Sequence, residues 1–396
     1  MRIVHVSDCF APRVGGIETQ VQELAHHQAR AGHAVHVLTA TAASQHDVGP
    51  DRSRYRTSTT EAGPIRVHRL ASPWTFGVPV HPRGQSVITR ALRLLRPDVV
   101  HVHAGVISPF AQDGALAARE LDLPMAVTWH CVLDRMRRPL GWAARTGGWD
   151  GARFAPSAVS GLVAKQVADM LDRQDVTVVP NGLDLGPWRA VATAAPQANP
   201  EPGTLRVVAS QRLARRKRAV PLVRIITRAH EQLGRTSSGR PRIHLTVAGD
   251  GAGAAAIRSQ IAREDLYDVV TLLGRVPRGL LPTLYRAQDV FISPARLEAF
   301  GLAALEARTA GLALVGMAGS GIAEFITHGR EGLLAADDDA AAAALVTLAK
   351  DEDLLGSITA HNRTVPPSLG WADVLRRVEA LYARAREIHS GQVAPG

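Results

Sequence analysis

The stretch Glu298-Ala299-Phe300-Gly301-Leu302-Ala303-Ala304-Leu305-Glu306 places two carboxylates eight residues apart around a glycine. A short apolar run, Asp289 to Ser293, comes before it and predicts a buried strand. The apolar residues after the glycine predict a helix that ends at Gly311. Eight helical residues span about two turns, so the carboxylates are expected roughly 12 Å apart on nearly the same face. A strand, a glycine turn and a helix in this order indicate one unit of a parallel α/β sheet.

Two carboxylates at that distance cannot share one proton, which excludes a dyad of the aspartic-protease kind. They can instead contact the two ends of an elongated ligand. The backbone amides around Phe300, Gly301 and Leu302 at the helix start can hold an anion between them, helped by the helix dipole. A nucleotide sugar, with hydroxyls at both ends and phosphate in the middle, has this form. The alternative is that Glu298 caps the helix and Glu306 is a solvated surface residue.

Length and composition favour a soluble protein of two domains. The chain has 396 residues, of which 46% are hydrophobic, enough for two separate cores. No run approaches about 18 apolar residues, which argues against a transmembrane helix. The chain starts directly as a strand, Met1 to Val6, without the pattern of a signal peptide. Two cysteines, Cys9 and Cys131, provide no disulfide framework. We therefore expect a cytoplasmic protein, with peripheral contact at the inner face of the membrane left open.

The charge balance is basic. The formal net charge is +10, from 46 basic and 36 acidic residues. Only Lys165, Lys217 and Lys350 are lysines, and such arginine-rich usage is typical of a GC-rich, actinomycete-like bacterial genome. The positive field can attract phosphorylated ligands or an anionic membrane surface. Aromatic residues make up only 4% of the chain and do not interleave with basic runs, so nucleic acid is not an expected partner.

Strands and helices are predicted to alternate along the whole chain, which indicates parallel sheets built from βαβ units. Residues 1–189 are expected to form one doubly wound domain, in which residues 41–63 are a mobile loop. Residues 190–203 have a Pro/Ala-rich composition without a core pattern and are interpreted as a linker. Residues 204–370 are expected to form a second domain. The C-terminal residues 371–396 contain a predicted helix with one apolar face.

The E-x7-E stretch resembles the signature of retaining glycosyltransferases of family 4, which have the two-domain GT-B architecture. Ser293-Pro294 before the stretch and Ala307 to Gly311 after it also resemble this family, and the resemblance extends from residue 3 to about residue 383. It implies two Rossmann-like domains facing a cleft, the first for the acceptor and the second for a nucleotide sugar. It also implies that the C-terminal helix crosses back to the first domain. The implied reaction is retaining, metal-independent transfer of a hexosyl group from a GDP- or UDP-linked donor.

The resemblance carries roles for individual residues. Glu298 is expected to hold the hydroxyls of the donor sugar, and Glu306 those of the ribose. Arg212 and Lys217 follow the first strand of the second domain and match the cations that bind the diphosphate, where fixed charges stabilise a leaving group. His130 ends a predicted strand and matches the histidine that lies against the donor sugar.

Two further segments match family motifs. Gly15-Gly16 follows the first strand and resembles the N-terminal glycine loop, in which glycines let the backbone approach a phosphate or sugar closely. Arg275-Val276 is placed like the family segment that binds the nucleobase. The resemblance implies that the backbone amide of Val276 contacts the base.

Several neighbouring residues have plainer interpretations. The other cations of the basic run are expected to be surface charges: Arg215, Arg216 and Arg218. Three strand histidines are expected to be core or supporting groups: His5, His101 and His103. The run Asp337-Asp338-Asp339 contains D-x-D, a metal motif of a different glycosyltransferase fold, but acidic residues at a helix start are ordinary capping groups. No metal or other cofactor is therefore expected. Gly249 to Gly253 resembles a dinucleotide turn, so an NAD-dependent oxidoreductase is a rival hypothesis, as is a protein that binds sugar nucleotides without chemistry.

The sequence leaves two classes of acceptor open, a membrane lipid and a small soluble molecule. Residues 83–96 predict a basic amphipathic helix, and the tryptophan at Trp142 lies near further arginines, Arg135, Arg137 and Arg138. This pattern is compatible with docking on an anionic membrane, as in family members that mannosylate phosphatidylinositol. An outer helix of any α/β domain has the same two faces, however. We favour a small, polar, soluble acceptor such as a cyclitol or amino sugar.

Overall fold

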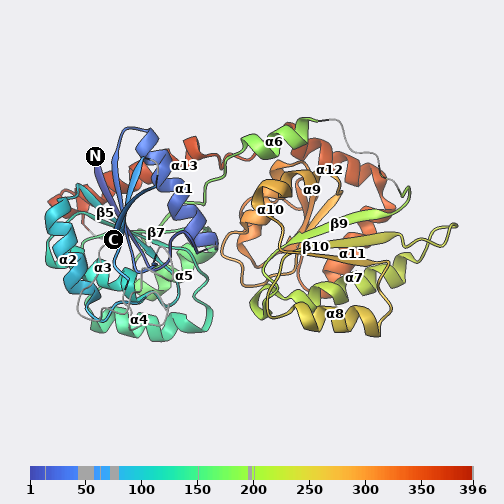
Figure 1. Cartoon of the computed structure of the whole chain (residues 1–396), viewed down its shortest axis with the longest axis horizontal. Coiled ribbons are helices and arrows are strands. Elements are labelled where there is room, and N and C mark those ends of the chain that lie inside the picture. Colours follow the sequence, from blue (N-terminus) through green and yellow to red (C-terminus); the bar gives the residue numbers. More distant parts are fainter. Residues whose placement is uncertain are drawn as a thin grey trace. The chain divides into compact units, whose positions relative to one another are not determined.

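The computed structural model describes residues 1–13, 15–42, 58–62, 64–71, 80–149, 151–194, 199 and 201–394. The chain divides into two units. Unit 1 comprises Met1–Gly182 and Trp371–Gly396, and unit 2 comprises Leu183–Gly370. Each unit has its own sheet of mostly parallel strands with helices packed around it (Figure 1). The prediction of two doubly wound, Rossmann-like units is confirmed.

The sheet of unit 1 has the strand order β3-β4-β2-β1-β5-β6-β7-β8. Its strands are β1 (Arg2–Ser7), β2 (Ala34–Thr39), β3 (Ser58–Ala62), β4 (Ile65–Arg69), β5 (Val99–Ala104), β6 (Met125–Trp129), β7 (Ala155–Ala158) and β8 (Thr177–Val178). Among the described strands of this sheet, only the edge strand β3 is antiparallel to its neighbour. The interpretation of residues 41–63 as a loop is therefore wrong for β3, because pairing with β4 overrides its polar pattern. Residues 43–57 lie outside the described residues.

The helices of unit 1 come from both ends of the chain. They are α1 (Gly16–Arg30), α2 (Gly84–Leu95), α3 (Pro109–Glu120), α4 (Arg137–Thr146), α5 (Gly161–Leu171) and the C-terminal α13 (Trp371–Ser390), with a short 3-10 turn η3 (Asp134–Met136). The apolar face of α13 packs on the sheet, where Val374, Val378 and Leu381 share a core with Ile3 and Val99. Among the described helices, none is both long and apolar enough to cross a membrane.

The sheet of unit 2 is fully parallel, with the order β11-β10-β9-β12-β13-β14. Its strands are β9 (Leu205–Ser210), β10 (Ile243–Ala248), β11 (Val270–Gly274), β12 (Val290–Ser293), β13 (Ala313–Met317) and β14 (Gly332–Ala335). Its α-helices are α6 (Gly186–Thr193), α7 (Ala219–Leu233), α8 (Ala254–Arg263), α9 (Leu281–Arg286), α10 (Leu302–Thr309), α11 (Asp338–Lys350) and α12 (Glu352–Thr364). Its described residues also form the 3-10 turns η4 (Arg215–Lys217), η5 (Arg278–Leu280) and η6 (Gly321–Glu324).

The boundary between the units differs from the expected linker at residues 190–203. Unit 2 already begins at Leu183, and α6 belongs to it. The ring of Trp188 in α6 is buried against Tyr285, with 5.4 Å between the ring centroids. Trp188 and Ala192 are the buried residues of this helix, and a Pro/Ala-rich composition gives no sign of such packing.

Candidate active site

The two central strands of unit 2 bring distant motifs to one edge of the sheet. In the strand order of this unit, the direction of the connections reverses between β9 and β12. Parallel α/β sheets bind ligands where loops leave the carboxyl ends of two such strands. The loop after β9 carries Arg212 and Lys217, and the loop after β12 carries Glu298. The topology therefore gathers these three predicted residues at one edge.

Lys217 and Glu298 are in direct contact. Lys217 is the last residue of η4, and its Nζ forms a hydrogen-bonded ion pair with Oε2 of Glu298. The two side chains are 35% and 16% exposed. The carbonyl oxygen of Glu298 accepts a hydrogen bond from the amide of Gly321 at 2.8 Å, which holds the loop from the other side. A cation and a carboxylate are thus fixed beside each other.

Glu298 does not lie on the helix, contrary to the spacing argument for the two carboxylates. The helix α10 begins only at Leu302, so Glu306 alone lies on it. The reason is Gly301, whose φ of 94° is in the left-handed region and separates the loop from the helix. The amides at the helix start precede the first intrahelical bonds and remain available to an anion. The ring of Phe300 is buried, so its backbone rather than its side chain can serve a ligand.

Glu306 is buried, which contradicts the alternative of a solvated surface residue. Its Oε1 accepts a hydrogen bond from Nε of Arg278 at 3.1 Å, and a second guanidinium nitrogen lies 3.0 Å away. Arg278 comes from η5, directly after the exposed Arg275 and the partly buried Val276. The ion pair therefore ties the predicted base-binding segment to α10. Sequence reasoning missed Arg278, because one more arginine in an arginine-rich chain carries no signal.

Arg212 is exposed in a loop that the neighbouring glycine turn supports. The amide of Leu213 donates to the carbonyl oxygen of Asp250 at 2.9 Å. A Cβ at Gly251 would lie 2.7 Å from the carbonyl oxygen of Leu213. The glycines at 249–253 are thus needed for close packing against the chain itself. This packing accounts for the motif without a dinucleotide and weakens the oxidoreductase hypothesis.

Arg218 is not a surface charge, contrary to its sequence interpretation. Its two terminal nitrogens donate to the two carboxylate oxygens of Asp338 at 2.7 and 2.8 Å, and one of them also donates to the carbonyl oxygen of Pro294. Arg215 and Arg216 are exposed, as expected. Arg215 and Arg216 lie within η4, whereas Arg218 follows the end of this turn with a left-handed φ of 57°.

The run Asp337–Asp339 has structural partners. Asp337 caps α11 by accepting a hydrogen bond from the first turn of the helix at 2.8 Å. Asp338 pairs with Arg218, and Asp339 pairs with Arg228. The capping interpretation of this run is confirmed.

Unit 1 presents its predicted residues at the carboxyl edge of its own sheet. Gly15 directly precedes α1 and Gly16 is the first residue of that helix, in the connection that leaves β1. His130 directly follows β6, two strands away from β1 in the sheet. His130 also lines a small pocket of unit 1 together with Asn181 and Trp371.

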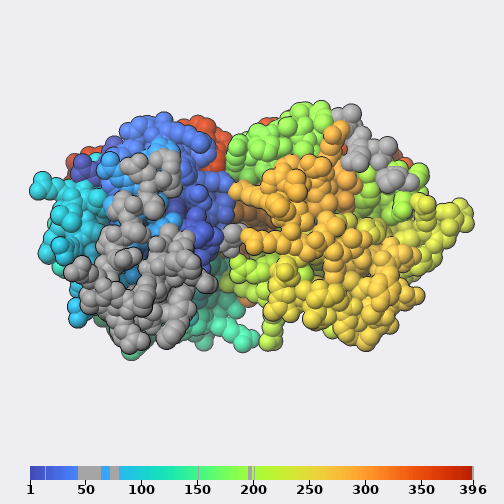
Figure 2. Space-filling view, viewed as in Figure 1, coloured from blue at the N-terminus to red at the C-terminus, as the bar shows by residue number. Residues whose placement is uncertain are grey.

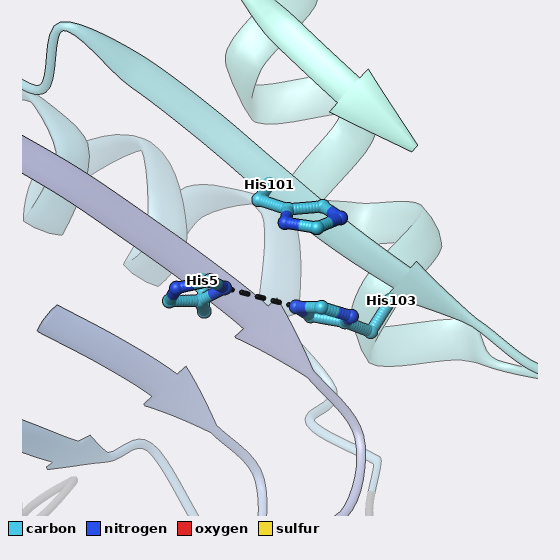
Figure 3. Close-up of side chains that lie close together, drawn as sticks. All are labelled: His5, His101 and His103. Atoms are coloured by element: carbon cyan, nitrogen blue, oxygen red, sulfur yellow. Dashed lines mark hydrogen bonds between the residues drawn. The ribbon is translucent and has the colours of Figure 1, made fainter. Parts of the chain in front are cut away.

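Three buried histidines extend from His130 into the core of unit 1. Nε2 of His130 lies 3.0 Å from Nδ1 of His103, and Nε2 of His103 lies 2.9 Å from Nδ1 of His5. His5 comes from β1, and His101 and His103 come from the neighbouring β5 (Figure 3). Burial lowers the pKa of His130 and of His5 to about 4, and those of His101 and His103 well below the usual value. All four imidazoles are therefore neutral at pH 7.

Comparison with known proteins identifies the family. Residues 14–186 match the family described as Glycosyltransferase Family 4, and residues 192–364 match Glycosyl transferases group 1. The chain is a family 4 glycosyltransferase. This glycosyltransferase is a hexosyltransferase that uses nucleotide-sugar donors. Members of the family are generally independent of metal ions.

Three relatives span most of the glycosyltransferase. Glycogen synthase of Mycobacterium tuberculosis is 27% identical, over 98% of this chain and 95% of the relative. The 2-deoxystreptamine N-acetyl-D-glucosaminyltransferase of Streptomyces fradiae is 28% identical, over 94% and 91%. The D-inositol 3-phosphate glycosyltransferase of Pseudarthrobacter chlorophenolicus is 29% identical, over 81% and 78%. The relatives include actinobacterial enzymes, in agreement with the arginine-rich composition.

The GT-B fold of the glycosyltransferase is shared with solved structures. A glycosyltransferase from Rickettsia africae aligns over 98% of each chain, with a TM-score of 0.73 and 17% sequence identity. The likeness confirms the GT-B fold that the family resemblance implies.

Proposed function

We propose that this enzyme transfers a hexosyl group, with retention of configuration, from a GDP- or UDP-linked sugar to a small polar acceptor. The observation that carries the proposal is the contact between Lys217 and Glu298, beside the start of α10 at the carboxyl edge of the unit 2 sheet. A fixed cation, a fixed carboxylate and free helix-start amides together suit a nucleoside diphosphate sugar.

The donor would extend along this edge of unit 2. Glu306 holds the ribose hydroxyls, and the segment Arg275-Val276 binds the base. The amides of residues 300–302, with Arg212 and Lys217, bind the diphosphate. Glu298 accepts hydrogen bonds from the sugar hydroxyls. The Arg278–Glu306 pair supports this order, because it links the base segment to the helix that carries the ribose ligand.

In the transfer step, the bond between the anomeric carbon and the diphosphate oxygen breaks, and the electron pair leaves with the diphosphate. The acceptor oxygen forms the new bond on the same face, and its proton passes to the departing diphosphate oxygen. Arg212 and Lys217 stabilise the negative charge that develops there. Glu298 is engaged with Lys217 as the partner of a cation, which favours this single step over a covalent glycosyl-enzyme intermediate.

A cyclitol or amino sugar is the acceptor class that we favour. Two of the three relatives are named for acceptors of this kind, 2-deoxystreptamine and D-inositol 3-phosphate. Both are six-membered carbocycles rich in hydroxyl or amino groups. The glycogen synthase relative is named for a polysaccharide, so a glucan primer belongs in the acceptor screen.

The donor is tested by a panel of GDP-, UDP- and ADP-linked sugars. A donor that binds only the native protein raises the melting temperature, with about 2.7 kcal/mol of stabilisation at 100 times its Kd. In Glu306→Ala the affinity for that donor is expected to fall at least about tenfold, the equivalent of one hydrogen bond to a charged group. Arg278→Ala is the matched control: it removes the other half of the ion pair and leaves the Glu306 carboxylate in place. A donor that binds Glu306→Ala as tightly as the wild type would remove Glu306 from the site.

Turnover is expected to survive EDTA. The cations and helix amides of unit 2 supply the positive charge that a metal provides elsewhere, and the aspartates of the D-x-D run have structural partners. The measurement is the initial rate of nucleoside diphosphate release with and without an excess of EDTA, which removes any metal that could act as a Lewis acid. Complete loss of activity, restored by Mg²⁺ or Mn²⁺, would contradict this prediction.

A membrane-associated transfer to a phosphatidylinositol-type lipid is the second candidate, favoured by one exposed aromatic. Trp142 on α4 is 66% exposed, between the exposed Arg138 and Arg145. The helix α2, whose cyan atoms lie at the surface in Figure 2, gives less support. Its apolar residues Ile88 and Leu92 are buried, as in any outer helix of an α/β unit, although Leu94 is exposed.

Sedimentation with anionic liposomes separates the two acceptor classes. At about 0.15 M salt the exposed charges are screened beyond about 8 Å, so only substantial binding survives. We expect most of the protein to stay in the supernatant, and Trp142→Ala/Arg138→Glu to keep wild-type activity on a soluble acceptor. Strong co-sedimentation of the wild type, lost in this variant together with turnover, would instead establish the lipid acceptor.

A further inference from the structure

A single hydrogen-bonded chain runs from His130 through the core of unit 1. Its links measure between 2.6 and 3.2 Å. The members are, in order, His130, His103, His5, Gln28, Tyr382, His101, Thr128, Ser157 and the carbonyl oxygen of Val127. We call this set the histidine chain. Its members come from β1, β5, β6 and β7 and from α1 and α13, and all of the side chains beyond His130 are buried.

The far end of the histidine chain determines its direction. The carbonyl oxygen of Val127 can only accept, so Ser157 must give its one hydroxyl hydrogen to that oxygen. Thr128 must then donate to Ser157, and His101 must donate to Thr128 through Nε2. Since a neutral imidazole has one hydrogen, Nδ1 of His101 accepts, and Tyr382 donates to it.

The same logic continues to His130. The hydroxyl oxygen of Tyr382 accepts from the amide nitrogen of Gln28, so the amide oxygen of Gln28 faces Nε2 of His5 and receives its hydrogen. Nδ1 of His5 must then accept from Nε2 of His103, and Nδ1 of His103 from Nε2 of His130. His130 consequently carries its hydrogen on Nε2. Its Nδ1 has no hydrogen and can only accept.

A divalent metal is the competing interpretation of the buried histidines. His5, His101 and His103 can each offer one ring nitrogen to a metal, and these three nitrogens lie within 4.8 Å of one another (Figure 3). All six ring nitrogens, however, already have partners in the histidine chain. A zinc ion with bonds of about 2.0 Å would break the His5–His103 hydrogen bond. This group also contains no carboxylate or thiolate to offset the charge of the ion in a buried site.

We propose that the histidine chain is a positioning device that holds His130 as a neutral imidazole with its hydrogen on Nε2 and presents Nδ1 as a hydrogen-bond acceptor. Gln28 and Tyr382 are positioning residues that act through His5 and His103 without touching the substrate. The chemical use of Nδ1 rests on the function proposed above: a hydroxyl of the bound substrate donates to it. A protonated His130, or one with its hydrogen on Nδ1, would offer a donor there and lose this contact.

The unliganded protein, labelled with ¹⁵N-histidine, tests the proposal by NMR without reference to activity. Long-range ¹H–¹⁵N spectra distinguish the two neutral forms of an imidazole and its charged form. The signal that disappears in His130→Asn assigns His130. At pH 7 we expect His130, His103, His5 and His101 all in the Nε2–H form. A charged His130, or one with its hydrogen on Nδ1, would overturn the proposal.

Tyr382→Phe removes one link and conserves the shape of the ring. Gln28 can then rotate its amide, so both directions become possible, and the His130 signal is expected to show a mixture of the two neutral forms. Turnover at saturating donor is expected to fall about tenfold, the kinetic equivalent of one hydrogen bond. Ser160→Ala is the control, because Ser160 caps α5 in the same unit outside the histidine chain. It should lower stability without changing the imidazole spectra.

Two results would count against the histidine chain as a positioning device. One is an unchanged His130 spectrum in folded Tyr382→Phe. The other is one tightly held zinc per protein, measured by elemental analysis and lost in His5→Ala. If the spectra agree with the Nε2–H form but no nucleotide sugar is turned over, the histidine chain stands and the proposed function fails, so the two failures are distinguishable.

Discussion

Replacing Lys217 by alanine is expected to lower kcat by about 10²- to 10³-fold, the usual cost of losing one preorganised group that stabilises developing negative charge. Lys217 is held before the substrate arrives, because its Nζ is paired with Glu298 and its side chain is only 35% exposed. The protein should stay folded, since a partly exposed ion pair contributes little to stability. The measurement is the initial rate of nucleoside diphosphate release, with the melting temperature measured alongside.

Arg216→Ala is the matched control for Lys217→Ala. It removes a cation from the same 3-10 turn, but from an exposed side chain outside the ion pair, so kcat should stay within about twofold of the wild type. If Lys217 and Glu298 act as one unit, the double alanine variant should be scarcely slower than the worse single variant. Wild-type turnover in folded Lys217→Ala would remove this pair from the reaction.

Asp175→Ala is expected to destabilise unit 1 by about 3–5 kcal/mol, the cost of leaving a buried charge without its partner. Arg173 is 1% exposed, and its guanidinium donates to both carboxylate oxygens of Asp175 at 2.8 and 2.7 Å. Asp175 also accepts a hydrogen bond from Arg384 of α13 at 3.1 Å. The variant therefore loosens the attachment of the C-terminal helix as well. Chemical denaturation followed by circular dichroism measures the change.

Asp169→Ala is the control for this prediction. Asp169 pairs with Arg137 at 2.6 Å on the same unit, but both side chains are more than 40% exposed. Its loss should cost at most about 1 kcal/mol, because water and salt screen an exposed pair. Equal effects of the two substitutions would show that the Arg173–Asp175 pair contributes no more than a surface ion pair.

Elements that depend on adjacent residues could be predicted from the sequence. The run from Asp289 to Gly311 encodes a buried strand, a glycine turn and a helix, and β12 and α10 form there. The apolar face of the last helix predicted its packing, and α13 packs on the unit 1 sheet. The linker at residues 190–203 differs from the observed boundary, because α6 belongs to unit 2 and is held there by two buried residues, Trp188 and Ala192.

The residues of the candidate site also fall into those that the sequence could indicate and those that only the structure reveals. Family motifs are short and contiguous, so Lys217, Glu298 and Glu306 could be selected from sequence. Their partners could not. The carboxylate of Glu306 pairs with Arg278 from a loop after another strand, and Arg218 pairs with Asp338, which is 120 residues away. An arginine in a chain with 46 basic residues has no distinguishing neighbours until the sheet assembles.

The sequence by itself determined the alternation of strands and helices, the two-unit organisation and the family, because each depends on patterns within a few residues. The tertiary structure alone decided that Glu298 lies off the helix, that Glu306 is buried in an ion pair, and that four histidines form one chain with Gln28 and Tyr382. Gln28 and Tyr382 are 354 positions apart in the sequence, yet the amide nitrogen of Gln28 lies 2.9 Å from the hydroxyl oxygen of Tyr382. Such contacts depend on the register of the strands and on which face α13 turns to them, and no local pattern of residues encodes either.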